Sequence, residues 1–199
     1  MTDKNIELQI LSGGVADILI EVRIHCKGGQ GGVTAARILG LAAVKEGKHA
    51  IAFPAFTVER RGAPIMAFVR ISNEPILNRS FIYNPDYVLV FDPALLTSQA
   101  VMVGVKGDTC FIVNSKVKPS LPKPVKSVAW LDADKVALEV LKAPIVNTVM
   151  CGAFAAISKL LSLKSVEEAV SEILPKHLID VNVKAVVRGY QSVVSDSSF

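Results

Sequence analysis

The sequence predicts a single α/β domain built in three layers (α/β/α) around a mostly parallel, mixed sheet. Short apolar runs typical of central parallel strands alternate along the chain with segments of helical pattern. A cluster of glycines joins the first of these strands to the first helix. The length of 199 residues suits one domain with a large core, because 51% of the residues are hydrophobic and only 20% are charged. We therefore assign residues 18–199 to this domain and residues 1–17 to a lead-in segment.

Alternating patterns predict the elements of the first half. Isoleucine, valine and cysteine alternate with charged residues and histidine over 18–26, which indicates a strand. Residues 33–45 follow as an almost wholly apolar helix, which Gly47 is placed to end. Further strands are expected over 49–53 and 65–72.

Continuous apolar runs predict the strands of the second half, at 87–91, 110–113 and 128–131. Before them, residues 76–81 are expected to fold back as a hairpin partner of the preceding strand. Asp92, followed by Pro93, is a predicted helix N-cap. The further predicted helices are 148–161 after the cap Asn147, a helix with the capping box Ser165–Glu168 that ends before Pro175, and 178–194.

Composition argues against several classes of protein. The net charge is +4, but the lysines and arginines are scattered without interleaved aromatic residues, so no nucleic-acid surface is expected. The first twenty residues do not resemble a signal peptide, and no apolar run reaches the ~18 residues that a membrane span needs. Cys26, Cys110 and Cys151 are far apart, so this chain alone is not expected to bind a metal or an iron–sulfur cluster. A reducing, cytoplasmic setting is expected.

The most informative segment is His25–Thr34, with the sequence HCKGGQGGVT, because it packs four glycines between a predicted strand and a predicted helix. Bare backbone N–H groups at a helix N-terminus suit the phosphates of a nucleotide or coenzyme. The same glycines also suit a neighbouring backbone that must come very close. The candidate binding residues are Gly28, Gly29, Gln30, Gly31, Gly32 and Thr34.

A dinucleotide fingerprint fits this segment poorly. Thr34 stands where the sixth position of G-x-G-x-x-G requires glycine, and the next predicted strand ends Ala52-Phe53-Pro54 without an acid for a ribose. No Gly-Lys-Ser/Thr follows the glycines, so a Walker loop is not formed either.

A second candidate segment is VERRGAP, residues 58–64. Arg60 and Arg61 can offer fork-shaped donors to a carboxylate or a phosphate. Alternatively, they pair with Glu59 or with acids of another subunit. A third group, Asp92, Asn114 and Asp132, follows the apolar strands, but helix capping explains the two aspartates better than ligand binding does. No catalytic residue and no metal ligand is predicted.

Four stretches together resemble the gamma subunits of the 2-oxoacid:ferredoxin oxidoreductases, and more closely the pyruvate branch of that family. The stretches are IHCKGGQGGVTAARILGLAA, AFPAFTVERRGAPIMAFVRIS, NPDYVLVFD and DVNVKAVVRGY. The resemblance implies a complex that decarboxylates a 2-oxoacid to an acyl-coenzyme A and passes electrons to ferredoxin. It implies thiamine diphosphate, Mg²⁺ and [4Fe-4S] clusters on alpha, beta and delta-type partner subunits. The resemblance also implies that this chain binds no cofactor alone, and that its glycine and VERRGAP loops face those subunits and coenzyme A.

Two positions depart from the family pattern, which usually has glycine at Cys26 and a branched residue at Gly32. Two alternatives to the resemblance are a free-standing module that binds NAD(P) or flavin and a pure assembly module. The missing sixth glycine and the missing ribose acid count against the first.

Overall fold

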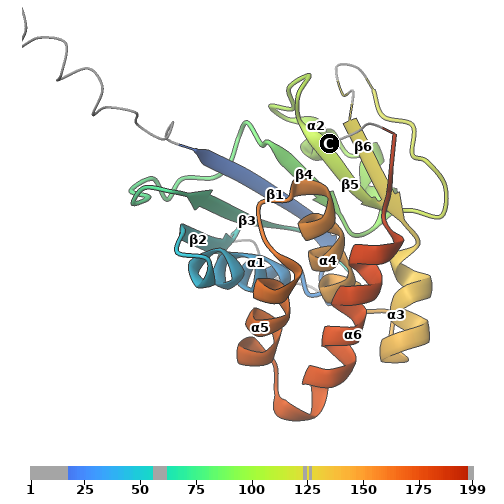
Figure 1. Ribbon diagram of the computed structural model, residues 1–199. Coiled ribbons are helices and arrows are strands. Elements are labelled where there is room, and N and C mark those ends of the chain that lie inside the picture. Colours follow the sequence, from blue (N-terminus) through green and yellow to red (C-terminus); the bar gives the residue numbers. More distant parts are fainter. Residues whose placement is uncertain (1–17, 56–61, 123–124, 126, 197–199) are drawn as a thin grey trace, which may run out of the picture.

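A mixed sheet forms the centre of the molecule in the computed structural model, which describes residues 18–55, 62–122, 125 and 127–196 (Figure 1). The predicted lead-in segment 1–17 lies outside these residues. The sheet has seven strands in the order β2-β3-β1-β4-β5-β6-β7. The strands are β1 (Leu19–Lys27), β2 (His49–Pro54), β3 (Pro64–Ser72), β4 (Tyr87–Val90), β5 (Cys110–Asn114), β6 (Ser127–Leu131) and β7 (Val194–Ser195).

Strand directions confirm the predicted mixed, mostly parallel sheet. β4, β5 and β6 are parallel to one another, as their continuous apolar sequences indicate, and β1 is parallel to β4. β3 lies between β1 and β2 and is antiparallel to both, and β7 is antiparallel to β6. The short β7 was not predicted, because its two residues carry too little pattern.

The two faces of the sheet are covered differently. One face carries the long helices. On the other face, the described residues form a short 3₁₀ helix, a single-turn helix and irregular segments (Figure 1). The long helices are α1 (Gly32–Lys45), α3 (Ala133–Leu141), α4 (Asn147–Ser158), α5 (Leu163–Ile173) and α6 (Lys176–Ser192). The opposite layer holds η1 (Pro93–Thr97) and α2 (Gln99–Met102).

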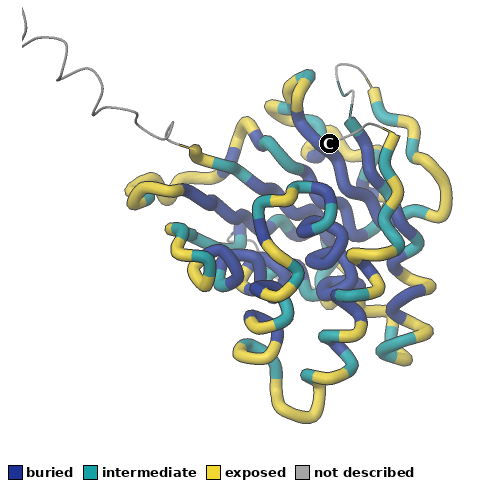
Figure 2. The backbone as a smooth tube through the Cα atoms, in the orientation of Figure 1, coloured by how far each residue is buried: buried dark blue, intermediate teal, exposed yellow. Residues whose placement is uncertain are grey.

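Strand β1 shows how the sequence pattern builds both faces. Val22, Ile24 and Cys26 point into the main core beneath α1 and α4, where the buried segments of Figure 2 converge. The intervening Arg23 and His25 are also buried, at 3% and 4% exposure, on the opposite face. The alternation therefore predicts the strand, but it conceals that both of its faces are buried.

The predicted hairpin strand 76–81 is wrong. Both edges of β3 are already paired, with β1 and β2, so no edge remains for a third strand. Instead, the Arg70 guanidinium holds this segment by donating to the carbonyl oxygens of Asn78 (3.2 Å) and Ser80 (2.7 Å). Arg70 also pairs with Glu21 at 2.7 Å.

Two of the predicted helix caps are found in the structure. Asp92 and Asp132 accept main-chain N–H groups of η1 and α3, as predicted. The other predicted caps are displaced. Asn147 is the first residue of α4, whose N-cap is Val146, and Ser162 rather than Ser165 caps α5. Helix α6 begins at Lys176 and ends at Ser192, two residues earlier at each end than the predicted 178–194.

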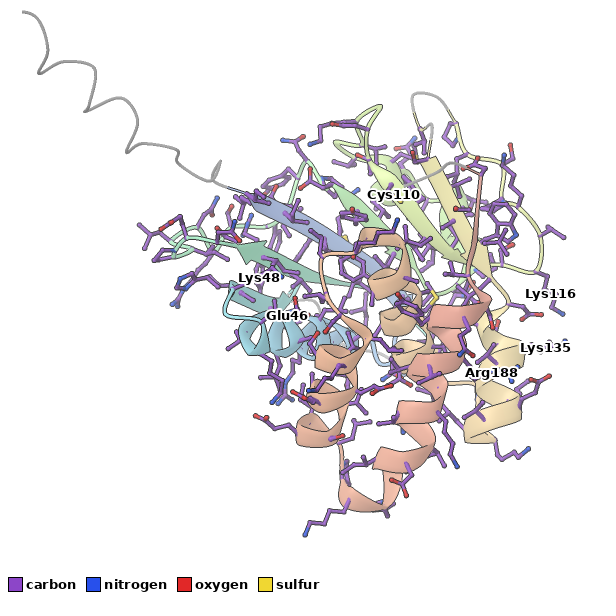
Figure 3. All side chains as sticks on the ribbon, in the orientation of Figure 1. Glu46, Lys48, Cys110, Lys116, Lys135 and Arg188 are labelled. Carbon is purple, nitrogen blue, oxygen red and sulfur yellow. The ribbon has the colours of Figure 1, made fainter. Side chains whose placement is uncertain are left out.

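Glu46 explains the displaced cap of α5. One carboxylate oxygen accepts the main-chain N–H of Ser162 (2.6 Å) and the hydroxyl of Ser165 (2.7 Å), while the other pairs with Lys48 at 2.7 Å (Figure 3). Partial burial would raise the pKa of Glu46, but these bonds outweigh it and lower the pKa to about 2. A carboxylate in the α1–β2 turn therefore anchors the start of α5, a tertiary contact that sequence pattern does not reveal.

None of the helices in the described part of the chain is both long and apolar enough to cross a bilayer.

Candidate functional site

The glycine loop connects β1 to α1 and has two flanks with different partners. On one flank, the Gly28 N–H donates to the carbonyl oxygen of Ala63 at 2.8 Å. The Gly62 N–H donates to the Gly28 carbonyl oxygen at 3.1 Å. These bonds continue the antiparallel pairing of β1 with β3 beyond Lys27 and Pro64. We call Gly28, Gly62 and Ala63 the closed flank, because Gly28 uses its backbone groups there.

The closed flank brings together the two segments that the sequence singles out. Gly62 and Ala63 belong to the VERRGAP segment, so the described end of that segment lies directly against the glycine loop. Arg60 and Arg61 lie outside the described residues.

Gln30 stiffens the loop from within. Its side-chain oxygen accepts the Lys27 N–H at 2.7 Å, and its own N–H donates to the Lys27 carbonyl oxygen at 3.0 Å. The oxygen of Gln30 is therefore engaged inside the loop, and Gln30 orients its neighbours by this pair of bonds.

Gly32 is required by close packing. A β-carbon added at this position would overlap the Sγ of Cys26, which is 1% exposed in the core. In this chain, Cys26 therefore occupies the space that a side chain at position 32 would need.

The other flank consists of Gly29, Gly31 and the first turn of α1, and we call it the open flank. Gly31 is the N-cap of α1, has φ of 77°, and offers no side chain to the helix. No side-chain cap hydrogen bond is present at this end of α1 within the described structure. Helix α1 therefore presents the N–H groups of its first turn, at the positive end of its dipole, to whatever lies beside the loop.

A pocket of about 310 Å³ lies beside the open flank. Its polar lining consists of Gly29, Gly31, Thr34, Asn147 and Asn182. Its apolar lining comes from α3, the α3–α4 connection, α6 and the residue that ends α5: Leu141, Ala143, Ile145, Leu174, Leu178 and Val181. The sequence predicts Gly29, Gly31 and Thr34 as site residues, but not Asn147 or the apolar wall, which come from distant parts of the chain.

The polar residues that follow the apolar strands make contacts that hold elements of the fold together. Lys27 pairs with Asp92 at 2.7 Å. Asn114 donates to the Phe91 carbonyl oxygen at 2.9 Å and accepts the Ala133 N–H at 2.9 Å. The structure therefore agrees with the interpretation of these residues as caps and links between elements.

The described residues do not form a donor set for a metal or cluster. They contain no group of three or more His, Cys, Asp or Glu residues close enough to hold a metal ion. Cys26, Cys110 and Cys151 lie on β1, β5 and α4. Burial and the charge of Asp196 raise the pKa of Cys110 to about 12, and burial also raises the pKa of Cys151, so both stay protonated thiols at neutral pH.

Strand order argues against the dinucleotide alternative. In a dinucleotide-binding fold, the strand after the first helix lies beside the first strand and carries the acid for the ribose. Here the strand after α1 is β2, which lies at the edge of the sheet with the antiparallel β3 between it and β1. It has the sequence HAIAFP, so this strand itself carries no acid for a ribose.

Comparisons with known proteins identify close relatives over nearly the whole domain. The family model for pyruvate ferredoxin/flavodoxin oxidoreductase matches residues 21–192. The common gamma subunit of the Pyrococcus furiosus pyruvate/ketoisovalerate oxidoreductases is 46% identical over 178 residues, which cover 87% of this chain and 96% of that protein. The Methanosarcina barkeri pyruvate synthase subunit PorC is 51% identical over 152 residues, which cover 75% of this chain and 84% of that protein.

A solved structure agrees with the sequence matches. The crystal structure of the pyruvate oxidoreductase subunit PORC of Thermotoga maritima has a TM-score of 0.78 and is 33% identical in sequence. The match covers 90% of this chain and 99% of that one.

Proposed function

Because the chain belongs to the pyruvate ferredoxin/flavodoxin oxidoreductase family, as a gamma subunit of a 2-oxoacid:ferredoxin oxidoreductase, we propose that it supplies hydrogen-bond donors for coenzyme A. It does so within a complex of alpha, beta and delta-type subunits. The glycine loop and the VERRGAP segment face these partners. The complex converts a 2-oxoacid to an acyl-coenzyme A in the cytoplasm and passes the electrons to ferredoxin.

The open flank is the observation that carries this proposal. Coenzyme A has phosphate groups, and the first turn of α1 offers them unused N–H groups beside Gly29 and Gly31. Arg60 and Arg61 add guanidinium donors from the VERRGAP segment, whose other end is hydrogen-bonded to Gly28. Coenzyme A binds between these segments and the active-site subunits.

Thiamine diphosphate, Mg²⁺ and the [4Fe-4S] clusters belong to the partner subunits in this proposal. When bound there, they supply the decarboxylation chemistry and the path of the electrons. This chain contributes no cysteine set for a cluster: Cys110 and Cys151 are buried on different elements with raised pKa values. Its part in the reaction is to bind and orient.

Co-expression tests the subunit assignment. The chain is produced alone and together with the neighbouring reading frames of its chromosome, and reduction of a dye is measured with pyruvate and coenzyme A. We expect activity only from the co-expressed complex. Turnover by the isolated chain, or a complex whose rate does not depend on coenzyme A, would contradict the proposal.

Variants of the VERRGAP segment test the role in coenzyme A binding. We expect Arg60→Ala and Arg61→Ala to weaken coenzyme A use or assembly, by about 1.5–3 kcal/mol for each charge-assisted hydrogen bond that the substitution removes. The half-saturation constants for coenzyme A and the 2-oxoacid are measured in the purified complex, together with its subunit composition. If assembly, turnover and both constants are unchanged, the proposed role of these arginines is wrong.

A further inference from the structure

Strand β2 leaves one edge of the sheet open in the described part of the chain. It pairs with β3 along one side, from His49 to Pro54, and it is the first strand in the order of the sheet (Figure 1). A strand at an edge presents a row of N–H and C=O groups for pairing. Between its ends β2 has the sequence AIAF, without the charged residues that protect many sheet edges. The outer edge of β2 is therefore suited to receive another strand.

A groove of about 420 Å³ lies beside β2, between α1 and α5. Small residues contribute much of its lining next to the strand: Gly40 of α1, and Ala50 and Ala52 of β2. Leu41 and Val44 of α1 add larger apolar side chains, and Val44 is 51% exposed. The groove therefore offers room and apolar surface to the side chains of a strand placed along β2.

The lead-in segment, residues 1–17, carries the sequence pattern of such a strand. Ile6, Leu8 and Ile10 are apolar, and the polar Glu7 and Gln9 stand between them. In an extended chain this alternation places the three apolar side chains on one face and the two polar ones on the other. The pattern is typical of a strand that covers an apolar surface on one side and meets water on the other.

The point where the chain enters β1 lies close to the open edge. Leu19 of β1 pairs with Ser72 of β3, which pairs on its other side with His49 of β2. Neighbouring strands are about 4.8 Å apart, so a strand added outside β2 lies about 14 Å from β1. Residues 11–18, which include Gly13–Gly14, span up to about 26 Å when extended. The connection is therefore long enough to bring residues 6–10 to the edge of β2.

The direction of an added strand follows from the same pairings. β1 and β2 are both antiparallel to β3, so they run in the same direction and start at the same end of the sheet. The connection to β1 would leave residue 10 at that end and residue 6 toward Pro54. A strand over residues 6–10 would therefore run antiparallel to β2, with one face toward the groove beside α1.

We propose that residues 6–10 pair with the outer edge of β2 as an antiparallel eighth strand and place Ile6, Leu8 and Ile10 against the groove between α1 and α5. The occupant is this chain's own lead-in segment, because its length and its point of entry bring it to this edge. The added strand closes this side of the sheet against pairing with other chains. The contact is independent of coenzyme A.

Leu8→Ser and Gln9→Ser form a matched pair that tests this strand. Both introduce the same residue at neighbouring positions, but only Leu8→Ser removes an apolar side chain from the groove. Serine is chosen because Arg37 and Glu172 also line the groove and would pair with an introduced charge. Hydrogen–deuterium exchange of the full chain is measured at residues 49–53. We expect Leu8→Ser to speed the exchange of the outward-facing amides about tenfold or more, and Gln9→Ser to change it less than about twofold.

Val44→Ser tests the same contact from the side of the groove. Val44 is 51% exposed on α1, so its substitution leaves the core of the domain intact. We expect it to speed the exchange of the same amides of β2, because the added strand loses an apolar neighbour. Leu138→Ser is the control: Leu138 is 52% exposed on α3, and its loss should leave the exchange of β2 unchanged.

Four results would overturn the proposed strand. The outward-facing amides of β2 exchange at the rate of unprotected amides in the parent chain, Leu8→Ser and Gln9→Ser have equal effects, Val44→Ser has no effect, or the protection of β2 rises with protein concentration. The last result would show that a second copy of the chain covers the edge. Sedimentation at the same concentrations gives the oligomeric state, and we expect protection of β2 in the monomer.

Discussion

The closed and open flanks of the glycine loop use neighbouring glycines in opposite ways. On the closed flank, Gly28 exchanges two backbone hydrogen bonds with Gly62 and Ala63, at 3.1 and 2.8 Å, and extends the pairing of β1 with β3. On the open flank, Gly31 begins α1 without a side-chain cap and lies against Asn147. The four glycines of the loop therefore do not share a single structural role. Some serve close packing, and the others leave donors available.

The largest expected effect is a pH dependence of stability that comes from His25 on β1, the strand that leads to the closed flank. Burial, together with the charge of Arg23, lowers the pKa of His25 from 6.5 to about 3, and His25 accepts a hydrogen bond from Arg23 Nε at 3.0 Å. The unfolded chain takes up a proton near pH 6.5, whereas the folded chain does not until about pH 3. Stability should therefore fall as the pH falls through this window, by about 1.4 kcal/mol for each pH unit.

Urea unfolding at a series of pH values measures this effect. His25→Gln keeps an acceptor for Arg23 and should lose most of the pH dependence between pH 6.5 and 4.5, above the range in which Glu46 titrates. His49→Gln, on an exposed residue of the edge strand, should retain it. Parallel pH profiles for the parent and His25→Gln would show that His25 is not the group responsible.

The packing of Gly32 predicts the next largest effect. Gly32→Val places a side chain against the Sγ of Cys26, and overpacking of this kind costs about 1–3 kcal/mol. Cys26→Gly removes the obstacle, so the double variant Cys26→Gly/Gly32→Val should be more stable than the sum of the single changes predicts. The free energy of unfolding of the four proteins gives the coupling, and additive changes would contradict the compensation.

A substitution of Gly31 is expected to reduce stability by a smaller amount, and it tests the packing of the open flank separately. Gly31→Ala forces a side chain into a left-handed conformation, at a cost of about 1–2 kcal/mol, and also against Asn147. Gly47→Ala is the control, since Gly47 has φ of +75° but nothing within 4 Å of an added β-carbon. Gly31→Ala should destabilise the protein more than Gly47→Ala does. In an Asn147→Ala background, the difference should shrink, because the side-chain nitrogen at 2.5 Å and Cγ at 3.0 Å are removed and only Cβ at 3.2 Å remains. An undiminished difference would show that Asn147 is not the obstacle.

Sequence reasoning recovers what local pattern determines. The glycine loop, α1, the parallel strands and the caps Asp92 and Asp132 follow from apolar periodicity and capping chemistry, and the structure confirms them. The hairpin at 76–81 fails because β1 and β2 pair with both edges of β3, which no local pattern can express. Ser162 displaces the predicted cap of α5 because Glu46 reaches it from more than a hundred residues earlier in the chain.

The residues of the candidate site also fall into those with a local sequence signal and those that only the fold brings together. Gly29, Gly31 and Thr34 are apparent in the sequence because glycines before a helix are a local signal. Asn147 looks like an ordinary helix cap until the fold places it against Gly31. The apolar wall comes from α3, α6 and their connections, and each of these residues alone is typical of a core.

Hydrogen–deuterium exchange of the assembled complex, with and without coenzyme A, tests the central claim most directly. We expect the amides of residues 29–34 to exchange more slowly when coenzyme A is present, and to be unaffected by the 2-oxoacid alone. The Gly62 amide on the closed flank, which already donates to the Gly28 carbonyl oxygen, should change less. Unaltered exchange at residues 29–34 in a complex saturated with coenzyme A would contradict the account.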